Sequence, residues 1–463
     1  MSSWIEEHLA HQQPDGSLYD WVSAGPPSML KKWAPQARVV YLKPGVRICA
    51  DRNSVEADQE SSAVIAAARV LAITGDRTWL QKDVAGRSLR ERCDDALTYL
   101  WQERRDARTG LITSGFTADW GDVTPVYPDQ RAIYLDEKTP RVVGLYTNAL
   151  AYQAARALAT MHEAAGDHAA ADRWWADAEW LKTAVEITLW KQSRGFYRMH
   201  VSTAAPRVDT GDADVLAMGG HAAALGAGLV DPARAALVLD ALDARRREMN
   251  LPTISFTLLP PLPAGLFQHP AVKEPWTYQN GGQWDWFGGR LVLAEFEYGR
   301  AARASEHLVE LARKAQQSGG LFEWHTRDGQ GRGSPQYAGS AGALGTAILE
   351  GLLGIRLSAE RLELKPRLGV LSAQVRLHEP ATGTGVEYDY RPSADEIVFT
   401  FAVTPPRATS VAVLLPPSWT EVEARLGARE LSTKKTHVGT DSYAVFETDG
   451  RRSELHLRPL RPR

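Results

Sequence analysis

Hydrophobic residues recur at helical spacing along most of the chain, from about residue 59 to about residue 355. In the segment 62–71, small and apolar residues favour a helix and are spaced to line one of its faces. We expect this helix to end at 74–76, because Gly75 suits the left-handed position after a helix and Asp76 can cap the next helix.

The same arrangement recurs further along. Helices are expected at 146–163 and 169–190, joined by the short Gly- and Asp-containing turn 165–167. Further helices are expected at 88–104, 212–227, 232–248, 283–298, 301–317 and 338–353. Short turns alternate with long loops rich in Gly, Pro, Asp and Trp, which predicts helical hairpins closed into an (α/α)-type barrel whose long loops converge on a cleft. An open helical solenoid is the alternative, but no fixed-period repeat supports it.

After Gly354 the pattern changes to a period of two. Apolar and polar residues alternate in 361–365, 386–390 and 397–401, and breaks that contain Pro and Gly separate these segments. A chain of 463 residues is long enough for one large core and one smaller core. The sequence therefore predicts a mainly α catalytic domain at 1–356 and a small antiparallel β-sandwich with a structural role at 357–463.

Composition excludes several classes of function. The formal net charge of −3 gives no electrostatic reason to expect binding to nucleic acid or to an anionic membrane. Two cysteines, Cys49 and Cys93, make no disulfide framework and fit a reducing compartment. Acids near the N-terminus and the lack of a long apolar run argue against a signal peptide or membrane span. We expect a cytoplasmic protein without a cofactor or bound metal. The sequence leaves open whether it forms a homo-oligomer.

The segment 275–286 combines aromatic residues, amides, a Gly pair and an acid in one short loop. Aromatic rings stack on the apolar faces of pyranoses, and amides and carboxylates bind hydroxyl groups. This combination predicts a carbohydrate site with these residues: Tyr278, Gln279, Asn280, Gly281, Gly282, Trp284 and Trp286. An aromatic plug in the core is the alternative. Fourteen of the fifteen tryptophans precede residue 330, which places this chemistry in the first domain.

Hydrolysis of a glycosidic bond requires two carboxyl groups. The loop 114–123 offers Asp119 and Asp122 on either side of Trp120 and Gly121. An aromatic neighbour can desolvate a carboxyl group and raise its pKa towards the range of a general acid. Asp119 is therefore a candidate acid, and Asp122 is either its partner or a ligand of a sugar hydroxyl. A simple Asp cap on a turn is the alternative.

A second acidic loop, 319–326, places Glu323 between Phe322 and Trp324, next to His325. The small, Gly-rich segment 334–342 follows it and contains Tyr337. We expect Glu323 to be the catalytic base and Trp324, His325 and Tyr337 to contact the substrate. The alternative is a structural glutamate paired with Arg327 or Arg332.

A third group of polar residues, 51–60, precedes a helix, and Arg52, Asn53 and Asp58 could reach sugar hydroxyls. Its other acids are explained by helix capping, as are most of those in 209–214. The sequence lacks the nucleophile elbow, the Walker phosphate loop and the calcium-hand spacing.

Taken together, these motifs resemble the six-hairpin glycosidases, a superfamily with glycogen-debranching-type glucosidases, α-L-rhamnosidases, trehalases and disaccharide phosphorylases. The resemblance covers nearly the whole chain and rests on the Asp-Trp loop at 118–122 and on 322–324 followed by 336–342. It implies an (α/α)6 barrel, Asp119 as general acid and Glu323 as general base, with Asp122 as the acid if the loop aligns three residues later.

The expected function is therefore an inverting, exo-acting glycoside hydrolase for short α-linked oligosaccharides or small glycosides. A disaccharide phosphorylase of the same fold is one alternative, with the stretch 327–340 supplying groups for phosphate. A non-catalytic carbohydrate-binding protein is the other.

Overall fold

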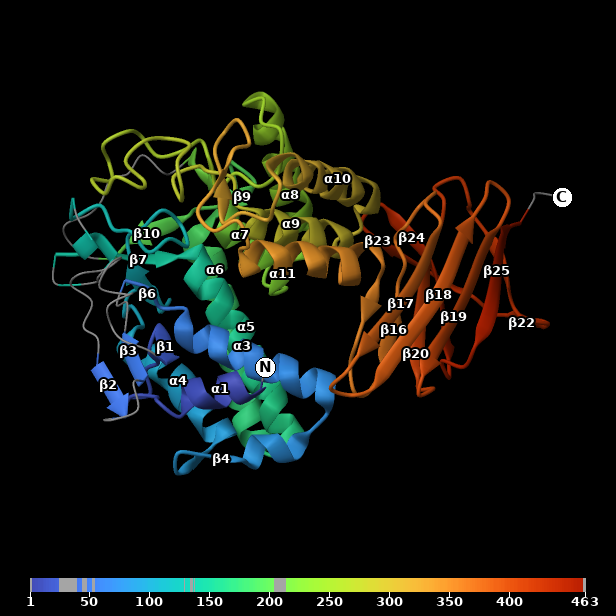
Figure 1. Ribbon diagram of the computed structural model, residues 1–463, viewed down its shortest axis with the longest axis horizontal. Helices are drawn as coiled ribbons and strands as arrows, with labels where there is room; N and C mark the ends of the chain where they lie inside the picture. The colour runs from blue at the N-terminus through green and yellow to red at the C-terminus, as the bar shows by residue number, and fades with distance from the viewer. Residues whose placement is uncertain are drawn as a thin grey trace. The chain divides into compact units, whose positions relative to one another are not determined.

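The computed structural model describes residues 2–24, 40–43, 48–51, 55–128, 130–133, 136, 138–203 and 214–460 (Figure 1). The chain separates into two compact units. The first unit comprises Met1–Leu71, Asp76–Phe287 and Ser318–Tyr337, and the second comprises Ala72–Gly75, Gly288–Gln317 and Ala338–Arg463. The domain boundary between residues 356 and 357 stays a prediction from the sequence.

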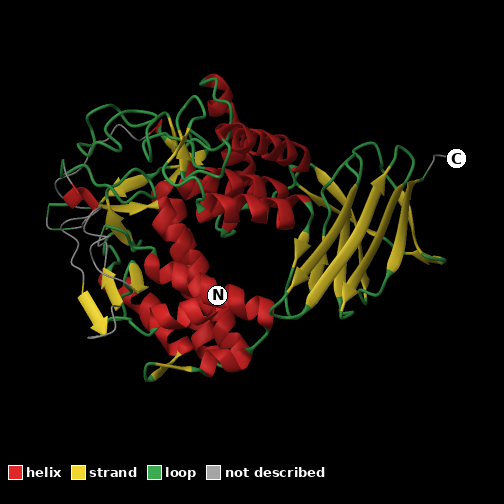
Figure 2. Ribbon diagram, in the orientation of Figure 1, coloured by secondary structure: helices red, strands yellow, loops and turns green. Residues whose placement is uncertain are grey.

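Helices dominate the chain up to residue 352, as the periodicity predicts (Figure 2). They are α1 (Ser2–Leu9), α3 (Gln59–Thr74), α4 (Leu89–Glu103), α5 (Leu145–Ala165), α6 (His168–Leu189), α7 (Met218–Gly226), α8 (Pro232–Glu248), α9 (Asp285–Glu297), α10 (Ala301–Ser318) and α11 (Ala338–Thr346), with 3-10 turns at Arg77–Gln81 and Gln130–Ile133 and a π-helical turn at Ala347–Leu352. In the described part of the chain, none of these helices is long and apolar enough to cross a membrane.

The turn between α5 and α6 has the predicted chemistry. Gly166 ends α5 in the left-handed conformation, with φ of +79°. Asp167 then caps α6, because its carboxylate accepts a hydrogen bond from the backbone N–H of Ala170 at 3.2 Å. This device reverses the chain within a few residues, so α5 packs antiparallel to α6 and also contacts α4 and α7.

The predicted start of the helix at 212 is wrong. Residues 212 and 213 lie outside the described residues, and α7 begins only at Met218. Before it, β11 (Leu216–Ala217) pairs with β12 (Leu258–Leu259) in an antiparallel bridge. Tertiary pairing with a distant loop thus overrides the local preference of this small-residue segment for a helix.

Short strands also connect the long loops of the first unit, and the periodicity did not predict them. One three-stranded sheet contains β1 (Trp21–Ala24), β2 (Val40–Lys43) and β3 (Ile48–Asp51), and another contains β6 (Thr113–Gly115), β7 (Arg141–Gly144) and β10 (His200–Ser202). Two-stranded ribbons are formed by β4 (Asp83–Val84) with β5 (Arg87–Ser88) and by β8 (Trp190–Lys191) with β9 (Phe196–Tyr197). A further ribbon is formed by β13 (Trp324–His325) with β14 (Gly331–Arg332). Beneath these loops lies a separate apolar cluster that includes Phe116, Val142, Leu262 and Phe267. Long loops with their own buried core can hold side chains in fixed positions.

The C-terminal part of the second unit is built from two sheets, as the alternating pattern predicts (Figure 2). One sheet has the order β15 (Ile355–Arg356), β16 (Leu362–Leu364), β20 (Thr409–Leu414), β24 (Asp441–Thr448) and β23 (Lys434–Val438). The other has the order β17 (Ala373–Glu379), β18 (Thr384–Pro392), β19 (Ile397–Thr404), β25 (Ser453–Pro459), β21 (Val422–Leu426) and β22 (Arg429–Leu431). The pairing departs from the prediction at one place, because β16 and β20 run parallel.

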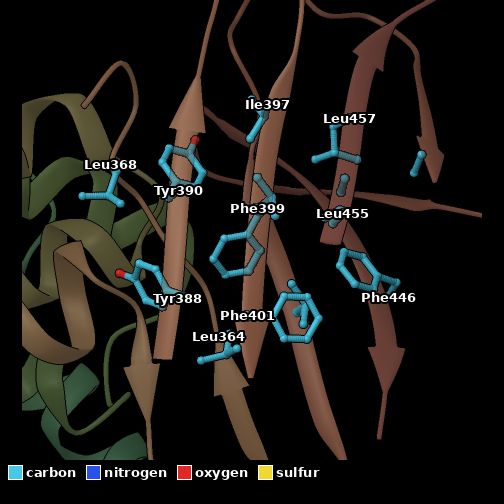
Figure 3. Packing of buried hydrophobic residues seen from close by; sticks show 14 of the residues in the cluster. Leu364, Leu368, Tyr388, Tyr390, Ile397, Phe399, Phe401, Phe446, Leu455 and Leu457 are labelled. Atoms are coloured by element: carbon cyan, nitrogen blue, oxygen red, sulfur yellow. The ribbon is translucent and has the colours of Figure 1, made fainter. Parts of the chain in front are cut away.

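Apolar residues from both sheets share one core, which Figure 3 shows around Phe399. The inward-facing residues of β18 and β19 alternate with outward-facing ones, so Tyr388, Tyr390, Phe399 and Phe401 all contribute to it. Trp419, the tryptophan that follows residue 330, is also part of this core and is 4% exposed.

Replacing Phe399 by Ala should therefore lower the free energy of unfolding of the second unit by about 3–5 kcal/mol, since the ring is fully buried. Denaturant titration followed by far-UV circular dichroism measures this loss. Thr400→Ala, next along β19 and only partly buried, is the control and should cost less than about 1 kcal/mol. Equal effects of the two substitutions would contradict the description of this core.

Candidate active site

The segment that combines aromatic and amide residues folds into a tight turn at 276–282. The backbone N–H of Trp276 donates to the carbonyl of Asn280 at 2.8 Å, and the N–H of Asn280 donates to the carbonyl of Thr277 at 2.8 Å. Trp276 and Tyr278 both have positive φ, +67° and +43°. Bulky residues rarely adopt this conformation, and such strain persists only where the surroundings impose it.

The Gly pair serves the packing of this turn. Gly281 has a φ of +90°, and a Cβ atom added there would lie 2.8 Å from the ring of Pro261. A Cβ at Gly282 would lie 2.4 Å from the carbonyl oxygen of Tyr278. Both glycines are buried, so they permit a close approach of backbone segments rather than contact with a ligand.

Asn280 also has a structural role in place of the predicted sugar contact. It is fully buried, and its Oδ1 accepts from the backbone N–H of Leu262 at 2.8 Å. Its amide nitrogen donates to the carbonyls of Leu262 at 3.2 Å and of Val272 at 3.1 Å. The side chain thus attaches the loop 262–272 to the turn.

Two consecutive residues of the turn, Tyr278 and Gln279, bind the two acidic loops. The hydroxyl of Tyr278 donates to Oε1 of Glu323 at 3.2 Å, and Nε2 of Gln279 donates to Oδ1 of Asp122 at 2.8 Å. Burial, and then the charges of Asp122 and Glu323, raise the pKa of the Tyr278 hydroxyl. Both carboxylates therefore lie within electrostatic reach of one hydroxyl group.

The surroundings of Glu323 differ from the predicted alternative of an arginine pair. Among the described residues, Oε2 of Glu323 accepts from the backbone N–H of Ser334 at 3.4 Å. The guanidinium of Arg327 lies over the ring of Trp276 at 4.5 Å, and Arg332 donates to Gln330 at 3.1 Å. Glu323 is partly exposed and is oriented by a hydroxyl and a backbone N–H.

Asp119 caps helix α7 from a distant loop. Its Oδ2 accepts from the backbone N–H of Gly220 at 2.9 Å, and the N–H of Gly219 binds the same carboxylate. Ala217, at the cap position of α7, has no side-chain group for this purpose. Burial raises the pKa of Asp119 to about 7, although the two N–H groups oppose that shift.

The aromatic residues form one contiguous cluster around the acidic loops. The ring of Trp120 lies 4.6 Å from that of Trp284 and 5.5 Å from that of Trp286. Trp284 is 1% exposed and donates its Nε1 to the carbonyl of Tyr278 at 3.0 Å, so it is the core plug of the cluster. The partly exposed rings are Trp120, Tyr278, Trp286, Trp324 and Tyr337. These rings can offer apolar faces to a sugar.

A group of carboxyl groups lies beside Asp122. Glu56, Asp58 and Asp119 line one small cavity with Trp120 and Tyr146. Burial and the neighbouring charges, Asp20 first, raise the pKa of Asp58 to about 7 and that of Glu56 well above its usual range. The sequence identified Asp58, but Glu56 was missed, because an acid before a helix is explained by capping. Asp20, which lies directly before β1, was missed because no motif surrounds it.

Three further residues, His325, Arg52 and Asn53, were also predicted to contact the substrate. His325 is fully buried, and its backbone exchanges hydrogen bonds with Gln283 at 2.8 and 2.9 Å, so it joins two loops. Its Nε2 lies 3.2 Å from the hydroxyl of Ser318. Arg52 and Asn53 lie outside the described residues.

Comparisons with known proteins show the fold of this chain. No family model and no curated protein matches the sequence. Three solved structures are similar over most of the chain. The α-L-rhamnosidase from Dictyoglumus thermophilum has a TM-score of 0.59 at 13% identity, over 99% of this chain and 43% of that protein.

The α-L-rhamnosidase from Streptomyces avermitilis, complexed with L-rhamnose, has a TM-score of 0.58 at 15% identity, over 98% of this chain and 36% of that protein. The family GH78 rhamnosidase of Bacillus sp. GL1 has a TM-score of 0.55 at 16% identity, over 79% of this chain and 34% of that protein. The chain thus spans less than half the length of each. At these identities the likeness shows the fold alone, and that fold is the one of α-L-rhamnosidases, which are among the proteins that the sequence resembles.

Asn280→Ala should lower the free energy of unfolding by about 3 kcal/mol, because it leaves three buried backbone groups without partners. Urea denaturation measures the loss. Thr277→Ala, in the same turn but with an exposed hydroxyl contact, serves as the control and should cost under about 1 kcal/mol. A loss no larger than that of the control would show that Asn280 does not hold the loop.

The raised pKa of Asp119 predicts a pH dependence of stability. The folded protein holds this proton up to a pH of about 7, whereas the unfolded chain releases it near 3.8. Stability therefore falls as the pH rises between these values. Asp119→Asn, which keeps an oxygen for the N–H of Gly220, should reduce that fall in unfolding experiments between pH 4 and 7.5. An unchanged pH dependence would count against the raised pKa.

Proposed function

We propose that this chain is a glycoside hydrolase in which Asp122 and Glu323 are the catalytic pair. The observation that supports this most directly is the contact of each carboxylate with one of two consecutive residues, Tyr278 and Gln279. Two acids from distant loops are thereby brought to one short stretch of backbone. Partly exposed aromatic rings, Trp120 and Trp324 among them, surround this place.

In this proposal Asp122 protonates the leaving oxygen and Glu323 activates a water molecule, which inverts the anomeric centre. The Tyr278 hydroxyl donates to Oε1 of Glu323 and so orients the carboxylate that acts as the base. Gln279 fixes the direction of the Asp122 carboxyl group. Helices α3 to α11 would form the (α/α)6 barrel of a catalytic domain at 1–356, followed by the sandwich domain at 357–463.

We assign the acid to Asp122 rather than to Asp119, although the resemblance implies either. One oxygen of Asp119 is taken by the first turn of α7, and the other is buried without a hydrogen-bond partner in the described structure. The charge of Asp122 acts on the same hydroxyl as that of Glu323, the hydroxyl of Tyr278. Asp119 would then support the loop that carries Asp122.

The substrate would be a short α-linked oligosaccharide or small α-glycoside, cleaved from one end. Aryl α-L-rhamnopyranosides are the first candidates, because the similar structures are α-L-rhamnosidases. We also propose a location in the cytoplasm, because the two cysteines, Cys49 and Cys93, make no disulfide framework.

The test is to incubate the purified protein, without phosphate, with aryl α-L-rhamnosides, other aryl α-glycosides and α-linked di- and oligosaccharides. The wild type should release sugar, and Asp122→Asn and Glu323→Gln should each reduce kcat by about 10²–10⁴-fold. Tyr278→Phe, which removes only the hydroxyl that orients Glu323, should cause a smaller loss. Proton NMR of the first product formed would show the inverted anomer.

Other outcomes would change the proposal. Turnover that requires added phosphate would replace hydrolysis by phosphorolysis. Full activity in Asp122→Asn together with its loss in Asp119→Asn would move the acid to Asp119. Sugar binding without turnover on every substrate, unaffected by either Asp122→Asn or Glu323→Gln, would favour a non-catalytic binding protein.

A further inference from the structure

The ribbon that carries Glu323 contains an extra residue opposite it. Strands β13 and β14 pair with Trp324 opposite Arg332, so a regular ribbon would place Gly333 opposite Glu323. The backbone N–H of Glu323 donates instead to the carbonyl of Ser334 at 2.9 Å. Gly333 and Ser334 therefore both face Glu323, and Gly333 has a left-handed φ of +69°. This arrangement is a β-bulge with glycine at its left-handed position, and such bulges often lie next to active sites, where they redirect a side chain.

The carboxylate of Glu323 occupies the space that a side chain at position 333 would fill. A Cβ atom added to Gly333 would overlap Oε2 of Glu323 and would lie 2.9 Å from its Cδ and 2.8 Å from its Cβ. The same Oε2 accepts from the backbone N–H of Ser334 at 3.4 Å, and Oε1 accepts from the hydroxyl of Tyr278 at 3.2 Å. Glycine at 333 thus leaves room for the one position in which the carboxylate makes both bonds.

Strand β13 is held on its other edge and resists displacement. The backbone groups of His325 and Gln283 exchange hydrogen bonds at 2.8 and 2.9 Å. The side-chain Nε2 of Gln283 also donates to the carbonyl of Thr326 at 2.7 Å, and His325 is fully buried. A side chain at 333 would therefore displace the carboxyl group, which is the flexible end of Glu323, more readily than the strand.

We propose that Gly333 is a positioning residue for the catalytic base, because the absence of a side chain there allows the Glu323 carboxylate to lie between Tyr278 and Ser334. This inference rests on the proposed function. A general base must lie within hydrogen-bond reach of the water that it activates. Gly333 contributes no chemical group of its own, so it acts on the reaction only through the position of Glu323.

The experiment compares Gly333→Ala with Gly329→Ala on the aryl α-glycoside that the wild type cleaves fastest. Gly329 lies in the same hairpin and has a φ of +85°, and a Cβ atom there would meet no atom within 4 Å. Both substitutions impose similar backbone strain, but only Gly333→Ala meets the base. Since a misplacement of about 1 Å can slow a reaction about 10²-fold, Gly333→Ala should lower kcat by about 10–10²-fold. Its KM should stay within about threefold of the wild type, and Gly329→Ala should change kcat by less than about threefold.

A double-mutant cycle distinguishes positioning of the base from general damage to the ribbon. In the Glu323→Gln background the base is already absent, so adding Gly333→Ala should change kcat by less than about threefold. A damaged ribbon would cause the same loss in both backgrounds, and that result would overturn the inference. A kcat for Gly333→Ala that equals that of Gly329→Ala would also overturn it.

Urea denaturation gives a second readout that does not depend on activity. Gly333→Ala should lower the urea midpoint more than Gly329→Ala, because it adds a steric contact to the same backbone strain. Glu323→Ala removes Cδ and Oε2, two of the three atoms nearest to the new Cβ, so the additional loss should shrink in that background. An additional loss that stays unchanged would show that the new side chain does not meet Glu323, and the inference would be wrong.

The two readouts separate this inference from the proposed function. If the wild type cleaves glycosides but either cycle departs from the expected result, the inference alone fails. If the wild type cleaves no glycoside, the proposed function fails, and the catalytic role of Gly333 fails with it, even where denaturation confirms the steric contact with Glu323.

Discussion

The hydrogen bonds of one turn, residues 276–282, fix the positions of the two carboxyl groups of the candidate site. Backbone groups that are removed from water must find partners, and here side-chain amides provide them. Asn280 attaches the turn to the loop 262–272. The positive φ values of Trp276 and Tyr278 persist because these contacts leave the chain no relaxed alternative. The positions of Asp122 and Glu323 then follow from Tyr278 and Gln279, the two residues before Asn280.

The periodic parts of the fold could be predicted from the sequence. The turn at Gly166 and Asp167 and the alternation in β18 and β19 depend on neighbours within a few positions, so local patterns reveal them. For the candidate site, the sequence indicated which types of residue take part but not which residues contact one another. Asn280 and Asp119 were assigned to sugar chemistry, whereas their hydrogen-bond partners lie 18 residues away in a loop and 101 residues away at the start of α7. Local spacing contains no record of such pairings.

The two units differ in which side chains they bring together. In the β-sandwich of the second unit, apolar residues of both sheets fill the shared core. The first unit instead gathers Glu56, Asp58 and Asp122 within reach of one another, which costs folding free energy through like-charge repulsion and burial. Arrangements of this kind are typical of sites that need carboxyl groups to keep their protons near neutral pH.

The contact of Asp119 and Trp120 with the first turn of α7 has an evolutionary consequence. A Cβ atom at Gly219 would lie 2.3 Å from the Trp120 ring and 2.7 Å from Oδ2 of Asp119. One at Gly220 would lie 3.1 Å from Oδ1 of Asp119. Substitutions in Asp119-Trp120 and in Gly219-Gly220, about a hundred positions apart, therefore depend on each other. Among descendants of this chain, any lineage that keeps Asp and Trp in the loop must keep glycine at the start of the helix, and a lineage that loses them releases that restriction.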